Sequence, residues 1–378
     1  MKNAIKILHT EWSGGWGGQE IRILSEMQGM QDRGFWVGLA AAAHTPIYKR
    51  AQELGFPVFA LGFRGNLDLK TFFGLIKIIK QNKINIINTH SSKDTWVGGL
   101  AAKFSKIKFI RTRHLSYAIK KTSFINRLAD HIVTTSENTR IGMIKNQSID
   151  PEKITAVSTR PSELEFNPEN FNKAVLRESL KKKFNIPEDA IVIGIVGFLR
   201  RMKRMDFFLE LAAALKDSVQ SGNIKTNIKF LMVGDGPCRA ELEKIILEKN
   251  LSDSVFITGH VNNPAEYMAM FDIGVLTSDQ GESSPQALSQ YLMMSLPVVV
   301  TDICDLSELS QRPESERQSY KLSPINDLEN MVSQLILLIN NLNYFSQEAQ
   351  KLRPWIIEHY GFSKMIDQME EIVQKVVG

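Results

Sequence analysis

Residues 84–114, INIINTHSSKDTWVGGLAAKFSKIKFIRTRH, carry the pattern from which the fold class follows. The stretch begins and ends with runs rich in apolar and β-branched residues, as buried parallel strands are. The segment at 95–106 between these runs is helical in pattern. A strand, a helix and a second strand in this order are typical of a parallel βαβ unit.

The same alternation runs through both halves of the chain. Further apolar runs predict strands at 5–10, 36–42, 58–63 and 131–136, and then at 190–198, 228–234, 254–259, 273–278 and 297–302. Prolines, acids and a basic run interrupt the pattern at 161–190, which indicates a linker and a short helix. A chain of 378 residues is also too long for one ordinary core. We therefore predict an α/β protein with two Rossmann-like, doubly wound domains, at 1–168 and 169–354.

The composition restricts the class of protein. Hydrophobic residues make up 43% of the chain and charged residues 23%, as in ordinary soluble proteins. Two cysteines without metal-type spacing predict a reducing, cytoplasmic setting, and we find no signal peptide or membrane-spanning run. The net charge of +5 is compatible with a phosphorylated small molecule, an acidic membrane surface or nucleic acid, and the alternative is that it serves only solubility. Aromatic and basic residues do not interleave as nucleic-acid stacking requires, so no nucleic-acid partner is expected.

A glycine-rich loop follows the first predicted strand, where open α/β sheets bind their ligands. It reads SGGWGGQE at 13–20, ahead of a predicted helix at 19–33, and contains Gly14, Gly15, Gly17 and Gly18. Glycines allow backbone N–H groups to approach a phosphate, and a helix N-terminus favours its charge. The loop is neither G-x-G-x-x-G nor a Walker A motif, and no acid ends the second strand. A dinucleotide dehydrogenase is therefore disfavoured.

Two histidines follow other predicted strands. His90 comes after the strand at 84–89, and His114 comes after the next strand, close to Arg111 and Arg113. A lone histidine is most often structural, but two at the carboxyl ends of strands are candidates for contact with a substrate.

A basic turn follows the first strand of the second half. The stretch GFLRRMKRMD at 197–206 places Arg200, Arg201, Lys203 and Arg204 at the start of a helix. Cations oppose the helix macrodipole there, so a bound anion would relieve the repulsion. We predict a phosphate site; a solvated basic turn is the alternative. The chain has no H-E-x-x-H, paired C-x-x-C or Asp-x-Asp motif, so no metal site is expected. It also lacks the G-x-S-x-G motif that carries the nucleophile of α/β-hydrolases, so a hydrolase of that fold is not indicated.

Taken together, these motifs resemble the GT-B glycosyltransferases of the retaining family-four, glycogen-synthase-like group, over nearly the whole chain. The early GG-x-E loop of the family corresponds to Gly17, Gly18 and Glu20, and its mid-domain histidine to His114. Its diphosphate-binding lysine, in G-R-L-x-x-x-K-G, corresponds to Lys203. Phe198 stands where that motif usually has arginine, a charge that Arg200 or Arg201 could supply. The stretches VGDGP (233–237) and TGHV (258–261), which includes Gly259, also match.

The most specific match is GESSPQALSQYLMMSLPVVV at 281–300. The family carries E-G-x-P, four residues and then E-A-M-A-x-G-x-P-V-V in this place. Glu282 matches the first acid, whereas Gln290 replaces the second acid and Ser295 replaces the glycine. The resemblance implies that Glu282 contacts the donor sugar and Gln290 the ribose. An amide can both accept from and donate to hydroxyls without burying a charge. Ser284 is expected to cap the helix, with Pro285 in its first turn.

The resemblance implies an enzyme that transfers a sugar from a nucleotide-diphosphate donor to a carbohydrate or lipid-linked acceptor with retention, without metal or other cofactor. The implied catalytic residues are Glu282, His114 and Lys203. The implied donor-binding residues are Gly17, Gly18, Arg200, Arg201, Lys203, Gly259, Glu282, Ser283, Ser284, Pro285 and Gln290. Acceptor-side candidates are Glu20, His90 and Arg113.

The family resemblance also implies that a C-terminal helix at about 355–378 packs back on the first domain. It favours lipopolysaccharide or surface-polysaccharide assembly in the cytoplasm, with peripheral contact at the anionic inner face of the membrane. A nucleotide-sugar epimerase of the same fold stays open, as does a non-catalytic nucleotide-sugar-binding protein, because of Phe198 and Gln290. A scaffolding role is a further alternative.

Overall fold

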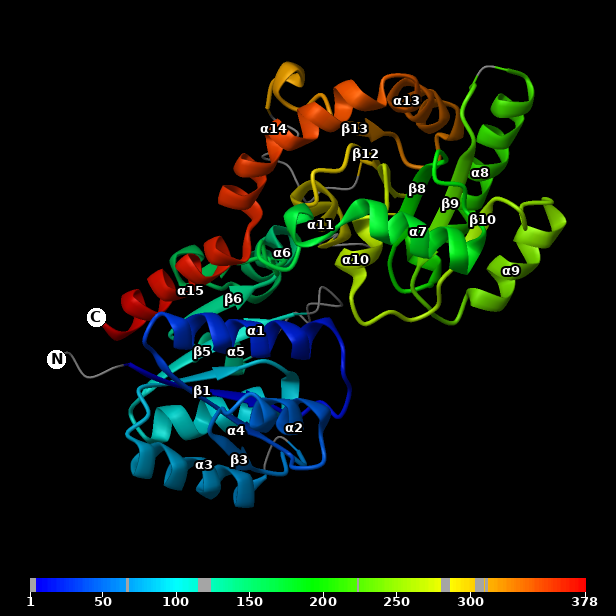
Figure 1. Ribbon diagram of the computed structural model, residues 1–378. Helices are drawn as coiled ribbons and strands as arrows, with labels where there is room; N and C mark the ends of the chain where they lie inside the picture. The colour runs from blue at the N-terminus through cyan, green and yellow to red at the C-terminus, as the bar shows by residue number, and fades with distance from the viewer. Residues whose placement is uncertain are drawn as a thin grey trace. The chain divides into compact units, whose positions relative to one another are not determined.

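The computed structural model describes residues 5–65, 68–114, 124–222, 224–279, 286–302, 309 and 312–378 (Figure 1). The chain divides into two compact units. Unit 1 comprises Met1–Thr159 and Ser363–Gly378, and unit 2 comprises Arg160–Phe362. The sequence analysis placed the corresponding boundaries at residue 168 and near residue 355.

Unit 1 contains a parallel sheet whose seven described strands follow the order β3-β2-β1-β4-β5-β6-β7. The strands are β1 (Lys6–Glu11), β2 (Trp36–Ala41), β3 (Val58–Ala60), β4 (Ile86–Thr89), β5 (Lys108–Arg113), β6 (His131–Thr134) and β7 (Ile154–Ala156). In register, Ile7 pairs with Val37 on one side and with Ile86 on the other. The strand order reverses at β1, so the carboxyl ends of β1 and β4 flank the point where such sheets bind ligands.

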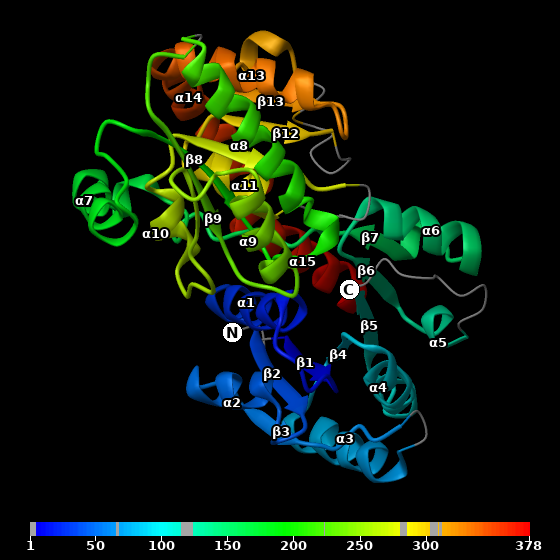
Figure 2. The same cartoon turned by 90° about the vertical axis from the view of Figure 1, so that its right-hand side faces the viewer.

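Helices cover both faces of this sheet. They are α1 (Gly18–Asp32), α2 (Pro46–Glu53), α3 (Leu69–Asn82), α4 (Ser92–Phe104), α5 (Phe124–Arg127), α6 (Glu137–Gln147) and α15 (Phe362–Val377). Apolar side chains of α3 and α4 form one core with strand residues such as Leu8 and Ile87. The helices α1 and α15 lie on the opposite side of the sheet from α3 (Figures 1 and 2).

Although α15 follows unit 2 in the chain, all of it except its first residue, Phe362, belongs to unit 1. Arg33, just after α1, forms ion pairs with Asp367 (2.6 Å) and Glu370 (3.0 Å). Lys375 donates to the backbone carbonyl of Glu152 at 3.0 Å. The helix buries one apolar face, formed by Met365, Ile366, Met369, Ile372, Val373 and Val376.

Unit 2 contains a parallel sheet of six described strands in the order β10-β9-β8-β11-β12-β13. The strands are β8 (Ile191–Val196), β9 (Ile228–Val233), β10 (Val255–Ile257), β11 (Ile273–Leu276), β12 (Val298–Thr301) and β13 (Tyr320–Ser323). This is the 3-2-1-4-5-6 order of a Rossmann sheet, with the reversal at β8. The predicted class, α/β with two Rossmann-like domains, is confirmed.

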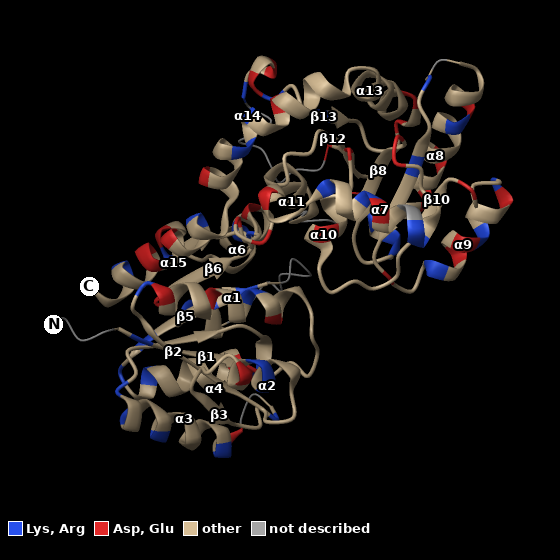
Figure 3. Cartoon of the chain, in the orientation of Figure 1, with Lys and Arg blue, Asp and Glu red and all other residues tan. Residues whose placement is uncertain are grey.

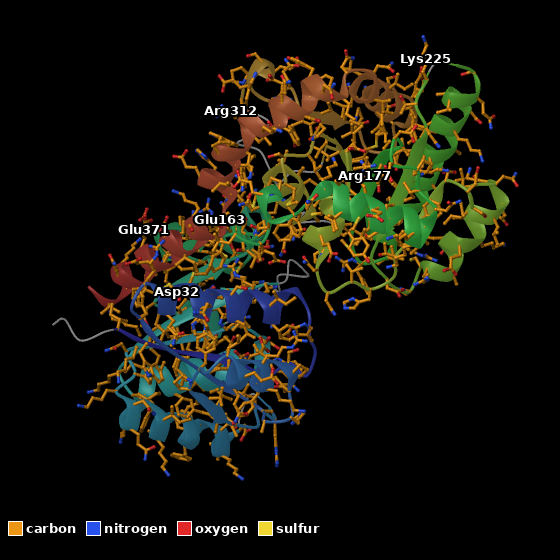
Figure 4. The ribbon with its side chains drawn as sticks, viewed as in Figure 1. Asp32, Glu163, Arg177, Lys225, Arg312 and Glu371 are labelled. Atoms are coloured by element: carbon orange, nitrogen blue, oxygen red, sulfur yellow. The ribbon has the colours of Figure 1, made fainter. Side chains whose placement is uncertain are left out.

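The sheet of unit 2 is also covered on both faces. Its helices are α7 (Lys173–Phe184), α8 (Met205–Gln220), α9 (Arg239–Glu248), α10 (Pro264–Met268), α11 (Gln286–Met293), α13 (Leu328–Asn340) and α14 (Leu342–Tyr360). One core contains side chains of α8, α9 and α13, and the other contains side chains of α7, α10, α11 and α14. Arg177 of α7 (Figure 4) pairs with Asp272, which also accepts from the backbone N–H of Val192 at 2.8 Å.

The sequence analysis missed β7 and β13. Both are edge strands, of three and four residues. Short 3₁₀ turns occur at Pro151–Lys153, Pro168–Asn170, Arg201–Lys203 and Glu314–Glu316. Within the described ranges, no helix combines the length and the apolar character needed to cross a bilayer.

Candidate active site

Three histidines form a hydrogen-bonded chain at the switch point of unit 1. Nδ1 of His9, on β1, lies 2.9 Å from Nε2 of His90, which follows β4. Nδ1 of His90 in turn lies 3.0 Å from Nε2 of His114, which follows β5. His9 and His90 are each 1% exposed, whereas His114 is half-buried. The structure thus brings together His90 and His114, and it adds His9, which the sequence analysis did not single out.

The histidine chain is neutral near pH 7. Burial lowers the pKa of His9 to about 3. Burial, together with the positive charges of Arg22 and Arg111, also holds the pKa of His90 and of His114 well below the usual 6.5. A neutral imidazole has one N–H, so His90 can donate to only one of its two neighbours and must accept from the other. The hydrogen bonds therefore run in one direction along the chain, either from His9 towards His114 or from His114 towards His9.

The direction of donation follows from the buried end of the chain. Nε2 of His9 has no hydrogen-bond partner among the described residues. This nitrogen either carries a proton with no acceptor or has a lone pair with no donor. A buried N–H without an acceptor is the rarer case in proteins. The favoured arrangement therefore has His9 donating to His90 and His90 donating to Nε2 of His114. His114 then carries its own proton on Nδ1 and can donate it to a ligand oxygen.

A carboxylate network holds the backbone around His90. Asp94, in the first turn of α4, accepts from the backbone N–H groups of His90 (2.8 Å) and Ser91 (2.9 Å) and from the hydroxyl of Thr10 (2.9 Å). Burial, together with the nearby carboxylate of Glu11, raises the pKa of Asp94 to about 7. These contacts join β1 to the start of α4 and so locate His90 between its two partners.

The glycine-rich loop is anchored at its two ends. The carboxylate of Glu11 accepts from the backbone N–H of Ser13 at 2.7 Å and from the hydroxyl of Ser91 at 2.7 Å. At the other end, the backbone N–H of Gly17 donates to the carboxylate of Glu20 at 2.9 Å. Glu20, an acceptor-side candidate, is thus 5% exposed and caps the start of α1.

The glycines of this loop are not explained by packing inside the unit. None of Gly14, Gly15, Gly17 and Gly18 has a positive φ. A Cβ added at any of them would meet no described atom closer than 3.5 Å. A small residue is therefore not required by the described neighbours, which agrees with a backbone that must stay accessible to a ligand.

Two arginines lie at the end of β5. Arg111 is 6% exposed and donates to the backbone carbonyls of Thr89 (3.1 Å) and Thr112 (2.7 Å). Burial lowers its pKa to about 10. Arg113, an acceptor-side candidate, is half-buried beside His114, and burial lowers its pKa too.

In unit 2, the predicted basic turn lies at the carboxyl end of β8. Lys203 is only 9% exposed, whereas Arg200 and Arg201 are exposed. The turn is tied to the end of β11, because the hydroxyl of Thr277 donates to the carbonyl of Lys203 at 2.9 Å. A buried lysine and two exposed arginines therefore share the edge of the sheet where ligands bind.

The glycines around this turn permit close contact between loops. A Cβ on Gly234, which has a φ of 142°, would lie 2.0 Å from the carbonyl oxygen of Gly197. Gly234 also forms a β-bridge with Gly259, a donor-binding candidate with a φ of 75°. The stem of Lys203 and the side chain of Met205 lie over Gly197, since a Cβ there would lie 3.6 Å from Cε of the lysine and 3.4 Å from Cε of the methionine.

Helix α11 is joined to the same edge. The hydroxyl of Tyr291, which is fully buried, accepts from the backbone N–H of Val196 at the end of β8 at 2.6 Å. Gln290 precedes this anchor and is half-buried. The remaining candidates of this segment, Glu282, Ser283, Ser284 and Pro285, lie outside the described residues.

Ser295 occupies a backbone conformation that favours glycine. It lies two residues after the end of α11, with a φ of 57°, and the next residue, Leu296, donates to the carbonyl of Tyr291 at 3.0 Å. This is the geometry of a helix C-cap, where glycine is the usual residue. The positive φ at this position therefore explains why the family motif has glycine here.

We expect Ser295→Gly to stabilise unit 2 by about 0.5–1 kcal/mol, because the left-handed strain exceeds the entropy that glycine loses on folding. Ser295→Val should be destabilising, since a β-branched residue tolerates this conformation poorly. Urea denaturation of both variants measures the effect. A Gly variant no more stable than the parent protein would contradict this account of the C-cap.

Several residues of the unit 1 site escaped the sequence analysis. His9 lies inside a predicted strand and had no flanking signal. Asp94 could have been found, since Ser91 and Asp94 have the spacing of a capping box. Across the described residues, no group of three or more His, Cys, Asp or Glu is arranged to hold a metal ion.

Comparison with known proteins identifies the family. The model for glycosyl transferases group 1 matches residues 177–351, and the model for glycosyltransferase family 4 matches residues 16–159. Among curated proteins, the chain is 23% identical over 322 residues to the UDP-Gal:alpha-D-GlcNAc-diphosphoundecaprenol alpha-1,3-galactosyltransferase of Escherichia coli. That alignment covers 81% of this chain and 79% of the relative. Two other relatives align over about half of this chain, and over 49% and 36% of their own lengths.

Solved structures share the fold. A glycosyltransferase from Rickettsia africae superposes with a TM-score of 0.83 at 18% identity, over 99% of each chain. Anabaena HepE in complex with UDP superposes with a TM-score of 0.79 at 15% identity, over 98% of this chain and 100% of that one. With the two family models matching the two halves of the chain, the protein belongs to the GT-B glycosyltransferases of the family-four type.

Proposed function

We propose that this glycosyltransferase moves a sugar from a nucleotide-diphosphate donor to a carbohydrate or lipid-linked acceptor, with retention at the anomeric carbon, in surface-polysaccharide or lipopolysaccharide assembly. The E. coli relative supports the acceptor class, because its name specifies a diphosphoundecaprenol acceptor. Unit 2 would bind the donor, and unit 1 the acceptor.

The observation that carries the proposal is the cationic turn after β8. Lys203 is 9% exposed, with its stem over Gly197, and two exposed arginines precede it. A cation held in this way is preorganised for the charge that develops on a departing diphosphate. Gln290 would contact the ribose and Glu282 the donor sugar. Gly17 and Gly18 would allow the backbone to approach the phosphates closely, although the N–H of Gly17 itself donates to Glu20.

His114 is the histidine proposed to contact the reacting sugar. With its proton on Nδ1, it would donate a hydrogen bond to an oxygen of the donor, while His90 and His9 hold the ring. No protein nucleophile is assigned, so the acceptor hydroxyl would attack from the side of the departing diphosphate. As the bond between the anomeric carbon and the diphosphate breaks and the new glycosidic bond to the acceptor oxygen forms, an oxygen of the leaving diphosphate would take the acceptor proton.

A panel of nucleotide-sugars, assayed with and without saccharide and lipid-linked acceptors, tests the proposal. Release of nucleoside diphosphate only when acceptor is present supports transfer. A product linkage with the same anomeric configuration as the donor supports retention. An altered sugar formed without acceptor would instead show an epimerase. Binding without turnover of any donor would show a nucleotide-sugar-binding protein.

We expect the transfer to be independent of divalent metal, because the chain has no Asp-x-Asp motif and carries cations at the proposed diphosphate site. Treatment with EDTA should leave kcat unchanged. Activity that disappears with EDTA and returns with manganese or magnesium would contradict this mechanism.

Gln290→Ala should weaken the nucleoside diphosphate and the intact donor by the same factor, because the ribose does not change during transfer. One neutral hydrogen bond corresponds to about a two- to tenfold effect, mostly in KM. Gln290→Glu should be tolerated, since the family carries an acid there. Calorimetry and steady-state kinetics measure both quantities, and unchanged nucleotide affinity in Gln290→Ala would refute the ribose contact.

A further inference from the structure

We propose that a cavity at the amino ends of β11 and β12 in unit 2 binds a short neutral saccharide. Its volume is about 590 Å³, which lies within the range of about 300–1,000 Å³ that small-molecule sites occupy. Asp272 and Pro297, which directly precede β11 and β12, both line it. The proposed donor site lies at the carboxyl ends of the strands, so this second site goes beyond the proposed function.

One part of the cavity lining is apolar. It contains the buried side chains of Phe271, Met294 and Leu296 and the half-buried ring of Phe171. A sugar ring has apolar C–H faces as well as hydroxyl groups, and an aromatic ring offers a large rigid contact area. This part of the lining can therefore cover one face of a sugar.

Helix α14 contributes the polar part of the lining. Ser346, Gln350 and Arg353 line the cavity, and their spacing of four and three residues places them on one face of the helix. The guanidinium of Arg353 is held in place, because it donates to the carbonyl of Met293 (2.7 Å) and to the amide oxygen of Asn167 (3.0 Å). Among the described residues, the side chains of Ser346 and Gln350 have no hydrogen-bond partner. They can therefore bond with the hydroxyls of a ligand.

The charges around the cavity balance. Lys173 and Asp272 line it as an ion pair of 2.9 Å, and Asp272 also pairs with Arg177. Of the described lining, one cation (Arg353) and one anion (Glu169) are left. Charged residues of both signs also occur along α14 (Figure 3). A phosphate or a nucleotide would require an excess of cations, whereas sugar hydroxyls can donate to a carboxylate and accept from a guanidinium.

Ser295 provides an independent observation. It lines the cavity, half-buried, and keeps a φ of 57° where glycine would be unstrained. Its hydroxyl has no hydrogen-bond partner in the described parts of the chain. A strained residue at the wall of a cavity points to a function of its side chain. Binding of a ligand hydroxyl accounts for a serine at this position.

Saturation-transfer NMR on the full-length protein tests the proposal, with neutral disaccharides and trisaccharides of glucose, galactose and N-acetylglucosamine as probes. A probe should bind, and Ser346→Trp, which fills the cavity, should abolish its binding. Gln350→Ala should weaken binding about two- to tenfold, the effect of one neutral hydrogen bond. The matched controls are Gln347→Trp and Gln347→Ala, which should leave the affinity unchanged. Gln347 is exposed on the same helix and does not line the cavity.

Ser295→Gly separates binding from stability. This variant should bind the saccharide about two- to tenfold more weakly, although its free energy of unfolding should rise. Asn250→Gly is the control, because Asn250 lies two residues after the end of α9 with a φ of 53°. The next residue, Leu251, donates to the carbonyl of Ile246 at 2.8 Å, as in the cap at Ser295. Asn250→Gly should leave the saccharide affinity unchanged.

Three results would overturn the proposal: no binding of any probe, binding that persists in Ser346→Trp, and equal losses in the Gln347 controls. Displacement of the saccharide by inorganic phosphate would also overturn it, since the cavity would then be an anion site. Nucleoside-diphosphate affinity and transfer to a soluble acceptor should be the same in these variants and in the parent protein. Binding in this cavity does not require transfer, so failure of the proposed function would leave this test intact.

Discussion

A His90→Phe enzyme should retain its affinity for nucleoside diphosphate and lose about one to two orders of magnitude in kcat, the loss seen when the orienting partner of a functional histidine is removed. Phenylalanine removes both contacts of 2.9 and 3.0 Å, so neither the ring of His114 nor its tautomer is held. His114→Ala, which removes the donor itself, should lose about 10²–10³-fold. Kinetics at saturating donor and calorimetric titration with nucleoside diphosphate separate the two quantities.

His131 provides a matched control for this experiment. It is 2% exposed, burial lowers its pKa to about 4, and its Nε2 lies 2.9 Å from the hydroxyl of Thr155. It lies, however, at the amino end of β6, away from the ligand-binding edge. His131→Phe should therefore lower the thermal stability without lowering kcat.

Partial recovery in His114→Asn would support the assignment of the donor, because the amide N–H of asparagine lies near the position of Nδ1. Equal losses of kcat in His90→Phe and His131→Phe would instead show that damage to the fold explains both. An increase in KM alone would place His114 in ground-state binding rather than in the reaction step.

A Lys203→Met variant should bind nucleoside diphosphate about 10–100-fold more weakly, since a charge-assisted contact contributes about 1.5–3 kcal/mol. Methionine keeps most of the apolar stem that lies over Gly197, so the packing there is largely preserved. Arg201→Met should have a smaller effect, because this arginine is exposed and its charge is screened by solvent. Isothermal calorimetry with the nucleoside diphosphate measures each affinity.

Lys225 serves as the control for Lys203. It is exposed, extends into solvent from the loop that precedes β9, and so lies at the amino ends of the strands (Figure 4). Lys225→Met makes the same change in charge and should leave the affinity unaltered. If the two lysine variants lose affinity equally, only the net charge of the unit matters and Lys203 has no specific contact.

The sequence was sufficient for the fold class, because buried parallel strands and the helices between them have different periodicities. It was not sufficient for the strand order, since the periodicity of a strand is the same wherever it lies in a sheet. The strands β7 and β13 were missed because three or four residues at an edge leave almost no pattern.

The site was predictable to the extent that it depends on position along the chain. His90 and His114 were identified because they follow strands, but their contact depends on strand order, which brings β4 beside β5. His9, in contrast, lies within a predicted strand and its side chain is buried. The sequence pattern therefore gives no reason to separate it from the core residues around it. The positive φ of Ser295 also became visible only in the structure.

The position of α15 has a consequence for how the protein is made. The ribosome completes residues 1–159 long before Ser363, yet unit 1 includes both segments. Until α15 emerges, the surface that receives Met365, Met369 and Val373 stays uncovered, while unit 2 is already available to fold. The unit synthesised first is therefore the last to be finished, and the nascent chain should depend on chaperones during that interval.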